Sequence, residues 1–180
     1  MLESFTDYLL RWWLRSGRPR WSWFRRSVFE RGHSKIQLPA VQSIQDIESV
    51  LKQVTWTADG PLHLYDCISY PETTWAMKKD DCDGFSCLAA ALILSCLPEA
   101  GPVLLTAGVR PVRNSHTVCA FRWEGGISFF DNSSLRGDCT TYEDVVGLIS
   151  QNSNRLVCWD IRDPSSLKLV QFHAGSDPTA

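Results

Sequence analysis

The stretch KKDDCDGFSCLAAALILSCL, residues 78–97, places four charged residues directly before one of the most apolar runs in the chain. The apolar part, residues 87–97, is too long and too rich in Ala and Leu for a strand. It predicts a helix over residues 83–97 that ends before Pro98, with Cys82 at its start. The run is about half of the roughly 20 residues that a membrane span needs, and its length is typical of a buried core helix.

The composition is that of one globular domain with an extension: 180 residues, of which 44% are hydrophobic. The seven cysteines contain no CxxC pair, which argues against a zinc ribbon and a disulfide framework. We therefore expect reduced thiols, no metal and no cofactor. Arg11 and Arg15 interrupt the N-terminal segment, which lacks the apolar core of a secretory signal. These features predict a cytoplasmic protein.

Charge divides the chain into two parts. Residues 1–35 carry eight Lys or Arg against three Asp or Glu, whereas the remainder is acidic. We therefore predict a basic, Trp-rich helical arm, residues 1–38, and a body, residues 39–180. Apolar residues recur at helical spacing over residues 2–14, which predicts an amphipathic helix that SGRP at residues 16–19 ends.

Two helices of the body are predicted from capping residues. Ser43 with Asp46 predicts a capped helix that ends near Val54. Thr140 with Glu143 predicts a capping box for a helix over YEDVVGLIS.

Strands dominate the second half of the body. Residues 57–78 are rich in turn formers and are predicted to be mostly loop. Beyond the cysteine-bearing helix, short β-branched and aromatic runs predict strands over residues 102–110, 116–123, 127–131, 155–161 and 167–172. A long helix followed by an antiparallel sheet defines an α+β fold.

Cys82 occupies a position in which a thiol can become reactive. A thiol reacts as its thiolate, which unpaired N–H groups at a helix N-terminus stabilise and a nearby imidazolium stabilises more strongly. The neighbouring Asp80, Asp81 and Asp83 oppose thiolate formation if they point at the sulfur, so they must turn outward or be paired. The alternative interpretation is that Cys82 is a small residue at a helix cap.

His116 begins one predicted strand and Asp131 ends the next, so both lie on one predicted hairpin. A carboxylate bonded to one ring nitrogen of a histidine fixes its tautomer and leaves the other nitrogen for a thiol. His63 is a rival base, but it has no carboxylate partner at a useful spacing. The sequence therefore favours His116 and Asp131 as partners.

The position of the hairpin turn decides whether these two side chains can bond. A turn at residues 125–126 would place Asp131 opposite Ala120, too distant from His116. We therefore expect a turn centred nearer residue 124, which brings His116 and Asp131 level or diagonal. Alternation along a strand selects Asp131 over Asn132, with Asn132 as the substitute if the strand ends earlier.

The motif CDGFS resembles the Cys, acidic, Gly, aromatic, small motif of the transglutaminase-like superfamily. PVLLTAG resembles the strand that follows the cysteine helix in that family, and HTVCAFRWEGGISFFDNS resembles its block of His, strand, turn, strand and Asp. The resemblance covers residues 75–135. In two departures, Asp80 stands where the family often has glycine, and Thr117 and Val118 follow His116 in place of a small residue and tryptophan.

The resemblance implies a papain-like α+β fold with Cys82 as nucleophile, His116 as general base and acid, and Asp131 as orienting carboxylate. It implies a cysteine hydrolase or acyltransferase that acts on amide bonds of a peptide or protein substrate, with crosslinking when an amine replaces water. The Cys82 backbone N–H is the first expected donor to the oxyanion. Candidates for the second donor are the Trp75 indole and the Lys78 and Lys79 side chains. The alternative for Trp75 is a core or cleft-wall aromatic.

The arm combines aromatic and basic side chains, and its candidate docking residues are Trp12, Trp13, Trp21, Trp23, Arg25 and Arg26. Three interpretations are open: the arm packs on its own acidic body, it docks in a protein partner, or it contacts nucleic acid or a membrane surface. The acidic body favours the first two interpretations. The alternative to an enzyme is a non-enzymatic assembly protein, such as a phage particle component, that keeps the transglutaminase-like fold and docks through its arm.

Overall fold

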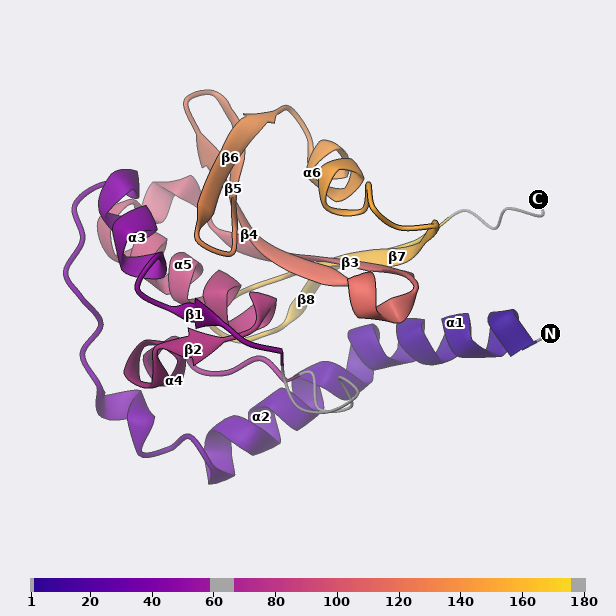
Figure 1. Cartoon of the computed structure of the whole chain (residues 1–180), viewed down its shortest axis with the longest axis horizontal. Coiled ribbons are helices and arrows are strands. Elements are labelled where there is room, and N and C mark those ends of the chain that lie inside the picture. The colour runs from indigo at the N-terminus through magenta and orange to yellow at the C-terminus, as the bar shows by residue number, and fades with distance from the viewer. Residues whose placement is uncertain (1, 59–66, 176–180) are drawn as a thin grey trace.

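The structure is a computed structural model that describes residues 2–58 and 67–175. The helices are α1 (Leu2–Trp12), α2 (Arg18–Val28), α3 (Ile44–Leu51), α4 (Pro71–Met77), α5 (Cys82–Cys96) and α6 (Tyr142–Ile149). The strands are β1 (Thr55–Trp56), β2 (Lys79–Asp80), β3 (Val103–Arg110), β4 (His116–Trp123), β5 (Gly126–Asp131), β6 (Ser134–Cys139), β7 (Arg155–Arg162) and β8 (Leu169–Ala174). The fold is α+β, as the sequence predicted (Figure 1).

Six strands form one antiparallel sheet in the order β6-β5-β4-β3-β7-β8. The chain runs from β3 outward to the β6 edge, crosses back through α6, and adds β7 and β8 on the other side of β3. β1 and β2 form a separate parallel pair in which Trp56 stands opposite Asp80. This pair holds Trp56 beside the segment that leads into α5.

The hairpin of β4 and β5 turns at residues 124–125, whose φ angles of 51° and 83° match a turn with two left-handed residues. Cys119 pairs with Phe130 across the hairpin. The turn therefore lies where the sequence predicted it. By this register Asp131 is diagonal to His116, and both side chains lie on the same face of the sheet.

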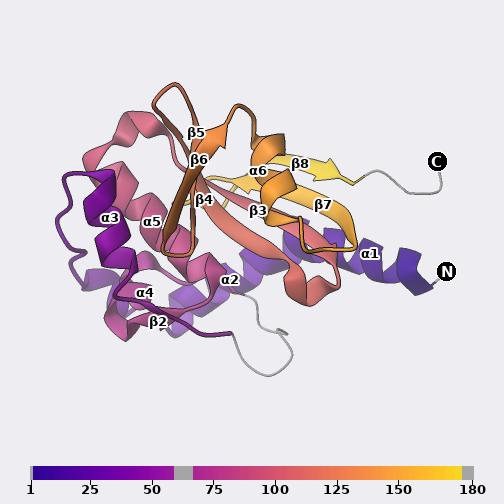
Figure 2. The same ribbon diagram turned by 45° about the horizontal axis from the view of Figure 1, so that its top comes forward.

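The two faces of the sheet carry separate layers. Leu88 of α5 packs in a core with Phe121 of β4 on one face. Val145 of α6 packs in a second core with Phe129 of β5 on the other face. The two views of the ribbon agree that α5 and α6 lie on opposite sides of the sheet (Figures 1 and 2).

A continuous helical rod, residues 2–28, is formed by α1, a π turn (Trp13–Gly17) and α2. Its Leu10 and Leu14 form a third cluster with Cys158 of β7. Gly108 of β3 permits this contact, because a Cβ atom there would lie 2.7 Å from Leu14 Cδ1. Since side chains alternate along a strand, Gly108 faces the same side as Leu104, so the rod and α5 cover the same face of the sheet.

The predicted end of the first helix at residues 16–19 is wrong. The Arg18 backbone N–H bonds to the Trp13 carbonyl, five residues back, which is the wider pattern of a π turn. Pro19 falls in the first turn of α2, where a proline's missing N–H and fixed φ are tolerated. The chain therefore continues as a helix through a sequence that would otherwise stop one.

Helix α4 corrects the prediction that residues 57–78 are mostly loop; residues 59–66 of that range lie outside the described part. Pro71 occupies its first turn, and Lys78 ends it in a left-handed conformation with φ of 53°. The helix is only seven residues long and therefore too short for a clear periodic signal.

The capping residues predicted for α3 are confirmed, and those predicted for α6 are wrong. Ser43 caps α3 by accepting the Asp46 N–H at 3.1 Å, although α3 ends at Leu51 rather than near Val54. The capping box of α6 consists of Thr141 and Asp144 rather than Thr140 and Glu143.

Among the described residues, no helix combines the length and apolar character that a membrane span needs.

Candidate active site

A cleft of about 570 Å³ opens where the N-terminus of α5, the start of β4, the end of β5 and the rod meet. Cys82, His116 and Asp131 all line this cleft. Asn132 and Trp56 line it as well. The three residues that the sequence singled out thus line one cleft from three different elements.

Cys82 is the first residue of α5, and its side chain is half-buried. Asp81 is the N-cap, with its side chain accepting the Asp83 N–H at 3.0 Å. The Ser86 hydroxyl lies 2.7 Å from the Cys82 carbonyl and 3.1 Å from the Thr117 carbonyl, so it ties the first turn of α5 to β4. The thiol therefore sits at the positive end of a helix that is fixed to the strand bearing the histidine.

His116 and Asp131 are hydrogen-bonded, with 2.8 Å between Nε2 and Oδ1. Because a carboxylate only accepts, Nε2 carries the proton and Nδ1 is left as the acceptor on the opposite side of the ring. The second oxygen of Asp131 lies 3.2 Å from Arg136 Nε. The hydrogen bond from His116 holds the pKa of Asp131 below its usual range against the effect of burial, and the charges of His116 and Arg136 reinforce it.

The three aspartates around Cys82 are buried and paired rather than turned outward. Asp80 accepts hydrogen bonds from the Thr74 hydroxyl at 2.5 Å and from the Asp81 N–H at 3.0 Å. Asp81 caps the helix. Asp83 forms an ion pair with Arg18 in which both side chains are only 1% exposed. A thiolate at Cys82 requires these aspartates to turn outward or to be paired, and they are paired.

Arg18 connects the rod to this site. Its guanidinium donates to the Thr106 hydroxyl at 3.1 Å and to the Thr117 hydroxyl at 3.0 Å, in addition to pairing with Asp83. Asp83 Oδ1 lies 3.8 Å from Cys82 Sγ. The positive charge of Arg18 therefore offsets the carboxylate next to the sulfur. Nothing in the sequence marks Arg18 among the arginines of the arm, so sequence reasoning missed it.

Among the described residues, Asp81, Cys82 and Asp83 form the group whose ligand atoms lie close enough to hold a metal ion. The Asp81 carboxylate caps α5, and the Asp83 carboxylate is paired with Arg18. These contacts account for both carboxylates as parts of the helix terminus. The donor set therefore does not fit a metal site.

The expected second oxyanion donors are not at the cleft. Trp75, Lys78 and Lys79 do not occur among the described residues that line it. Trp75 packs against the core beneath α4, with the Lys78 ammonium 2.6 Å from the centre of its ring. This placement agrees with the alternative of a core aromatic. His63, the rival base, lies outside the described residues.

Trp56 and Asn132 border the cleft in different ways. Trp56 is 53% exposed and was not singled out from the sequence, because its place beside Asp80 results from the β1–β2 pairing. Asn132 follows β5 in a left-handed conformation with φ of 53°, and its buried Oδ1 has no hydrogen-bond partner among the described residues. Asp131 rather than Asn132 bonds to His116, as the strand register predicted.

The candidate docking residues of the arm fall into two groups. Arg26 is buried and donates to the carbonyls of Ile68 and Ser69, and Trp13 lines the cleft. The others are exposed or half-buried on the rod: Trp12, Trp21, Trp23 and Arg25. The rod therefore packs on its own body with one face and leaves aromatic side chains on the other.

In comparisons with known proteins, no protein-family model matches the chain, and no curated protein matches it significantly.

Proposed function

We propose that the chain is a transglutaminase-like cysteine hydrolase or acyltransferase of papain-like architecture that acts on amide bonds. The observation that carries the proposal is the His116–Asp131 pair, hydrogen-bonded at 2.8 Å, in the cleft that Cys82 also lines. A thiol at a helix N-terminus, an oriented imidazole and a carboxylate behind it are the three parts that nucleophilic catalysis by cysteine requires. The N-terminus of α5, together with β4 and β5, supplies these parts from a helix packed on an antiparallel sheet.

In the proposed reaction His116 Nδ1 takes the proton of the Cys82 thiol, and the sulfur attacks the amide carbonyl carbon. Collapse of the tetrahedral adduct breaks the C–N bond, and His116 returns the proton to the leaving amine. Water then attacks the thioester, giving the acid and restoring the thiol, or a second amine attacks and gives a new amide. Asp131 keeps the proton on Nε2 throughout and stabilises the charged ring.

Two N–H groups are the candidates to bind the oxyanion. The backbone N–H of Cys82 lies at the helix terminus, where it has no intrahelical acceptor. Trp56 lines the cleft and carries an indole N–H, which supports assigning it the role of second donor in place of Trp75. The Trp56→Phe variant is expected to lose turnover while alkylation of Cys82 is unchanged.

Alkylation by iodoacetamide tests the proposal. Of the seven cysteines, Cys82 and Cys96 are half-buried and the other five are buried. Cys96 is therefore a control of comparable exposure outside the cleft, and burial raises its pKa. Cys82 is expected to react faster than Cys96 at neutral pH, and His116→Ala is expected to abolish the difference.

The alternative is a non-enzymatic assembly protein, such as a phage particle component, that keeps the fold and docks through the rod. The observation that favours it is the set of exposed aromatic side chains on the rod. Equal alkylation rates at Cys82 and Cys96, unchanged in His116→Ala, would support this alternative and contradict the catalytic proposal.

A further inference from the structure

The rod buries one face against the body and exposes an unusually apolar outer face. Residues 5–31, whose side chains are described, comprise the rod and the turn that directly follows it. Nine large apolar residues in this range are exposed: Phe5, Tyr8, Leu9, Trp12, Trp21, Trp23, Phe24, Val28 and Phe29. The remaining exposed side chains in this range are Thr6, Arg15, Arg20 and Arg31. We call this set the outer face of the rod. At about 1.5 Å per helical residue, it extends along roughly 40 Å.

Every exposed charge on the outer face is positive. The acidic residues in the same range, Asp7 and Glu30, are 6% and 3% exposed. Asp7 pairs with Arg110 and Arg155 of the body, and Glu30 pairs with Arg25. Glu30 also accepts the backbone N–H of Tyr70 of the body at 2.8 Å. Asp7 and Glu30 are thus both paired, which leaves arginines among aromatic residues at the surface.

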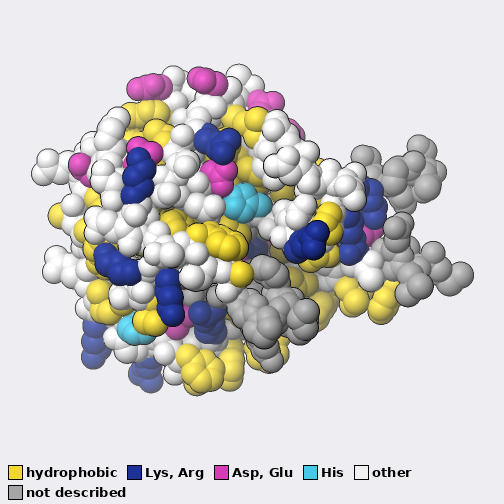
Figure 3. All heavy atoms as spheres, in the orientation of Figure 1, with side chains coloured by type: hydrophobic (Ala, Val, Ile, Leu, Met, Phe, Trp, Pro, Cys, Tyr) yellow, Lys and Arg dark blue, Asp and Glu magenta, His cyan; other side chains and the backbone are white. Residues whose placement is uncertain are grey.

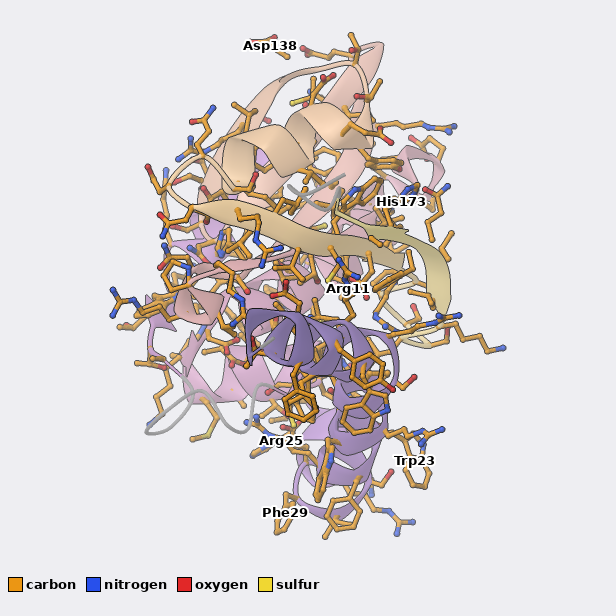
Figure 4. The ribbon with its side chains drawn as sticks, turned by 90° about the vertical axis from the view of Figure 1, so that its right-hand side faces the viewer. Arg11, Trp23, Arg25, Phe29, Asp138 and His173 are labelled. Atoms are coloured by element: carbon orange, nitrogen blue, oxygen red, sulfur yellow. The ribbon has the colours of Figure 1, made fainter. Side chains whose placement is uncertain are left out.

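The acidic side chains of the body and the hydrophobic side chains of the rod lie at different places on the molecule. Figure 3 shows acidic side chains gathered along the top, over the ends of β5 and β6, and hydrophobic side chains along the lower right edge, over α1 and α2. Figure 4 places Trp23 and Phe29 at the edge of the molecule farthest from Asp138, with both rings beyond the ribbon of α2. An anionic surface would therefore attract the rod and repel the opposite end.

The arrangement of the rings argues against nucleic acid. Trp21 and Phe24 meet edge to face at 85°, and Phe24 and Phe29 meet at 77°. Rings packed against each other in this way do not present parallel platforms for successive bases. A second copy of the chain is also disfavoured, because two outer faces brought together would oppose their arginines.

We propose that the outer face of the rod docks the protein on an anionic lipid surface. A helix that lies in the membrane interface has this composition, with Trp, Phe and Leu in the acyl boundary and basic residues at the headgroups. Tyr and Trp favour the same depth. Each arginine near an anionic leaflet adds attraction that salt screens. The inference does not depend on the proposed catalytic function.

Sedimentation with lipid vesicles tests this proposal on the full chain. Binding is expected to vesicles that contain phosphatidylserine, to be much weaker with phosphatidylcholine alone, and to fall as salt rises. Trp23→Ser with Phe29→Ser removes the two most exposed aromatic residues and is expected to lower partitioning by at least about tenfold. Trp56→Ser is the control, since Trp56 is an exposed aromatic residue that lies at the cleft and not on the outer face of the rod.

A second pair of variants tests the contribution of positive charge to vesicle binding. Arg20→Glu is expected to lower partitioning by about tenfold. Arg122→Glu changes an exposed arginine of β4, outside the rod, and is expected to leave binding unchanged. Failure of the wild-type chain to sediment with anionic vesicles would overturn the proposal. So would equal losses in the rod variants and their controls, or binding to single-stranded DNA or polyglutamate in place of vesicles.

Discussion

Arg18 of the rod and Asp83 of α5 form an ion pair in which each side chain is 1% exposed. Removing one member of such a pair leaves a buried charge uncompensated, at a cost of about 3–5 kcal/mol. We expect Arg18→Met to lower the free energy of unfolding by about this amount. Denaturant titration followed by circular dichroism measures the change.

The same substitution has a chemical consequence that mere loss of stability does not produce. Without Arg18, the charge of Asp83 acts on Cys82 Sγ from 3.8 Å, so thiolate formation becomes less favourable. The pH profile of Cys82 alkylation in Arg18→Met is expected to shift to higher pH. Arg20→Met, two residues away and exposed, should leave stability and profile unchanged. An unshifted profile in Arg18→Met would contradict this role.

The lowered pKa of Asp131 predicts that the stability of the fold decreases at acidic pH. The hydrogen bond from His116 lowers its pKa in the folded state below the unfolded value of about 3.9. The stability that this carboxylate contributes is therefore fully present above about pH 3.9 and is lost as pH falls through the folded pKa. A carbon-13 NMR titration should give a midpoint below 3.9 that rises in His116→Ala. A midpoint that does not move would show that His116 is not the cause.

At this scale the sequence predicted the residues with distinctive chemistry and missed those placed by tertiary packing. The position of Cys82 at the start of α5 was predicted from the helix signal beside it. The pairing of Asp131 with His116 was predicted from the spacing of the hairpin. Arg18 reaches Asp83 across 65 residues of sequence, through a π turn that no periodic pattern indicated. Trp56 reaches the cleft through a two-residue strand that carries no alternation to detect.

Among the elements, α5 depends on a close approach near its N-terminus. A Cβ atom on Gly84 would lie 2.1 Å from Asp80 Cγ, in a buried side chain that Thr74 holds by a hydrogen bond. Gly84→Ala is therefore expected to lower the free energy of unfolding by about 1–3 kcal/mol through overpacking. At about 2–4 °C per kcal/mol, thermal unfolding measures the loss.

Gly147 of α6 is the matched control, since it is helical and exposed and a Cβ atom there would have none of the described residues within 4 Å. Gly147→Ala is expected to raise stability by about 0.5–1 kcal/mol, because alanine favours the helix. A loss of stability in Gly84→Ala together with a gain in Gly147→Ala would support overpacking at Gly84 as the cause. A stabilising Gly84→Ala would contradict it.

The elements that sequence patterns predicted share a strong local signal. β3, β4 and β5 are apolar and largely buried, and each was predicted to within one or two residues. β6, with the sequence SLRGDC, was missed because it is a largely polar edge strand whose pairing with β5 comes from the register of the hairpin. Local patterns thus predict the core of the sheet and leave its edge to tertiary contacts.

For the whole molecule, the sequence divided the chain into residues 1–38 and 39–180, because the basic residues 1–35 precede an acidic remainder. The structure shows how closely the two parts are joined. Residues of the rod at a spacing of four are buried against the body: Leu10, Leu14, Arg18, Ser22 and Arg26. Arg162 of β7 also donates to the Leu14 carbonyl from the body side. These contacts lead us to expect that the two parts fold as one unit.

We accordingly expect residues 39–180 alone to lack a cooperative unfolding transition. Such a fragment loses the partner of Asp83, the cover of Cys158 and the donors to the carbonyls of residues 68–69. Buried polar groups and apolar surface would both be exposed, so the fragment should bind a hydrophobic dye, unlike the full chain. A peptide of residues 1–38 added in trans should restore the transition, because it supplies these contacts again. A fragment that unfolds cooperatively near the melting temperature of the full chain would show that the rod is dispensable for folding, and the charge boundary would then mark a true domain.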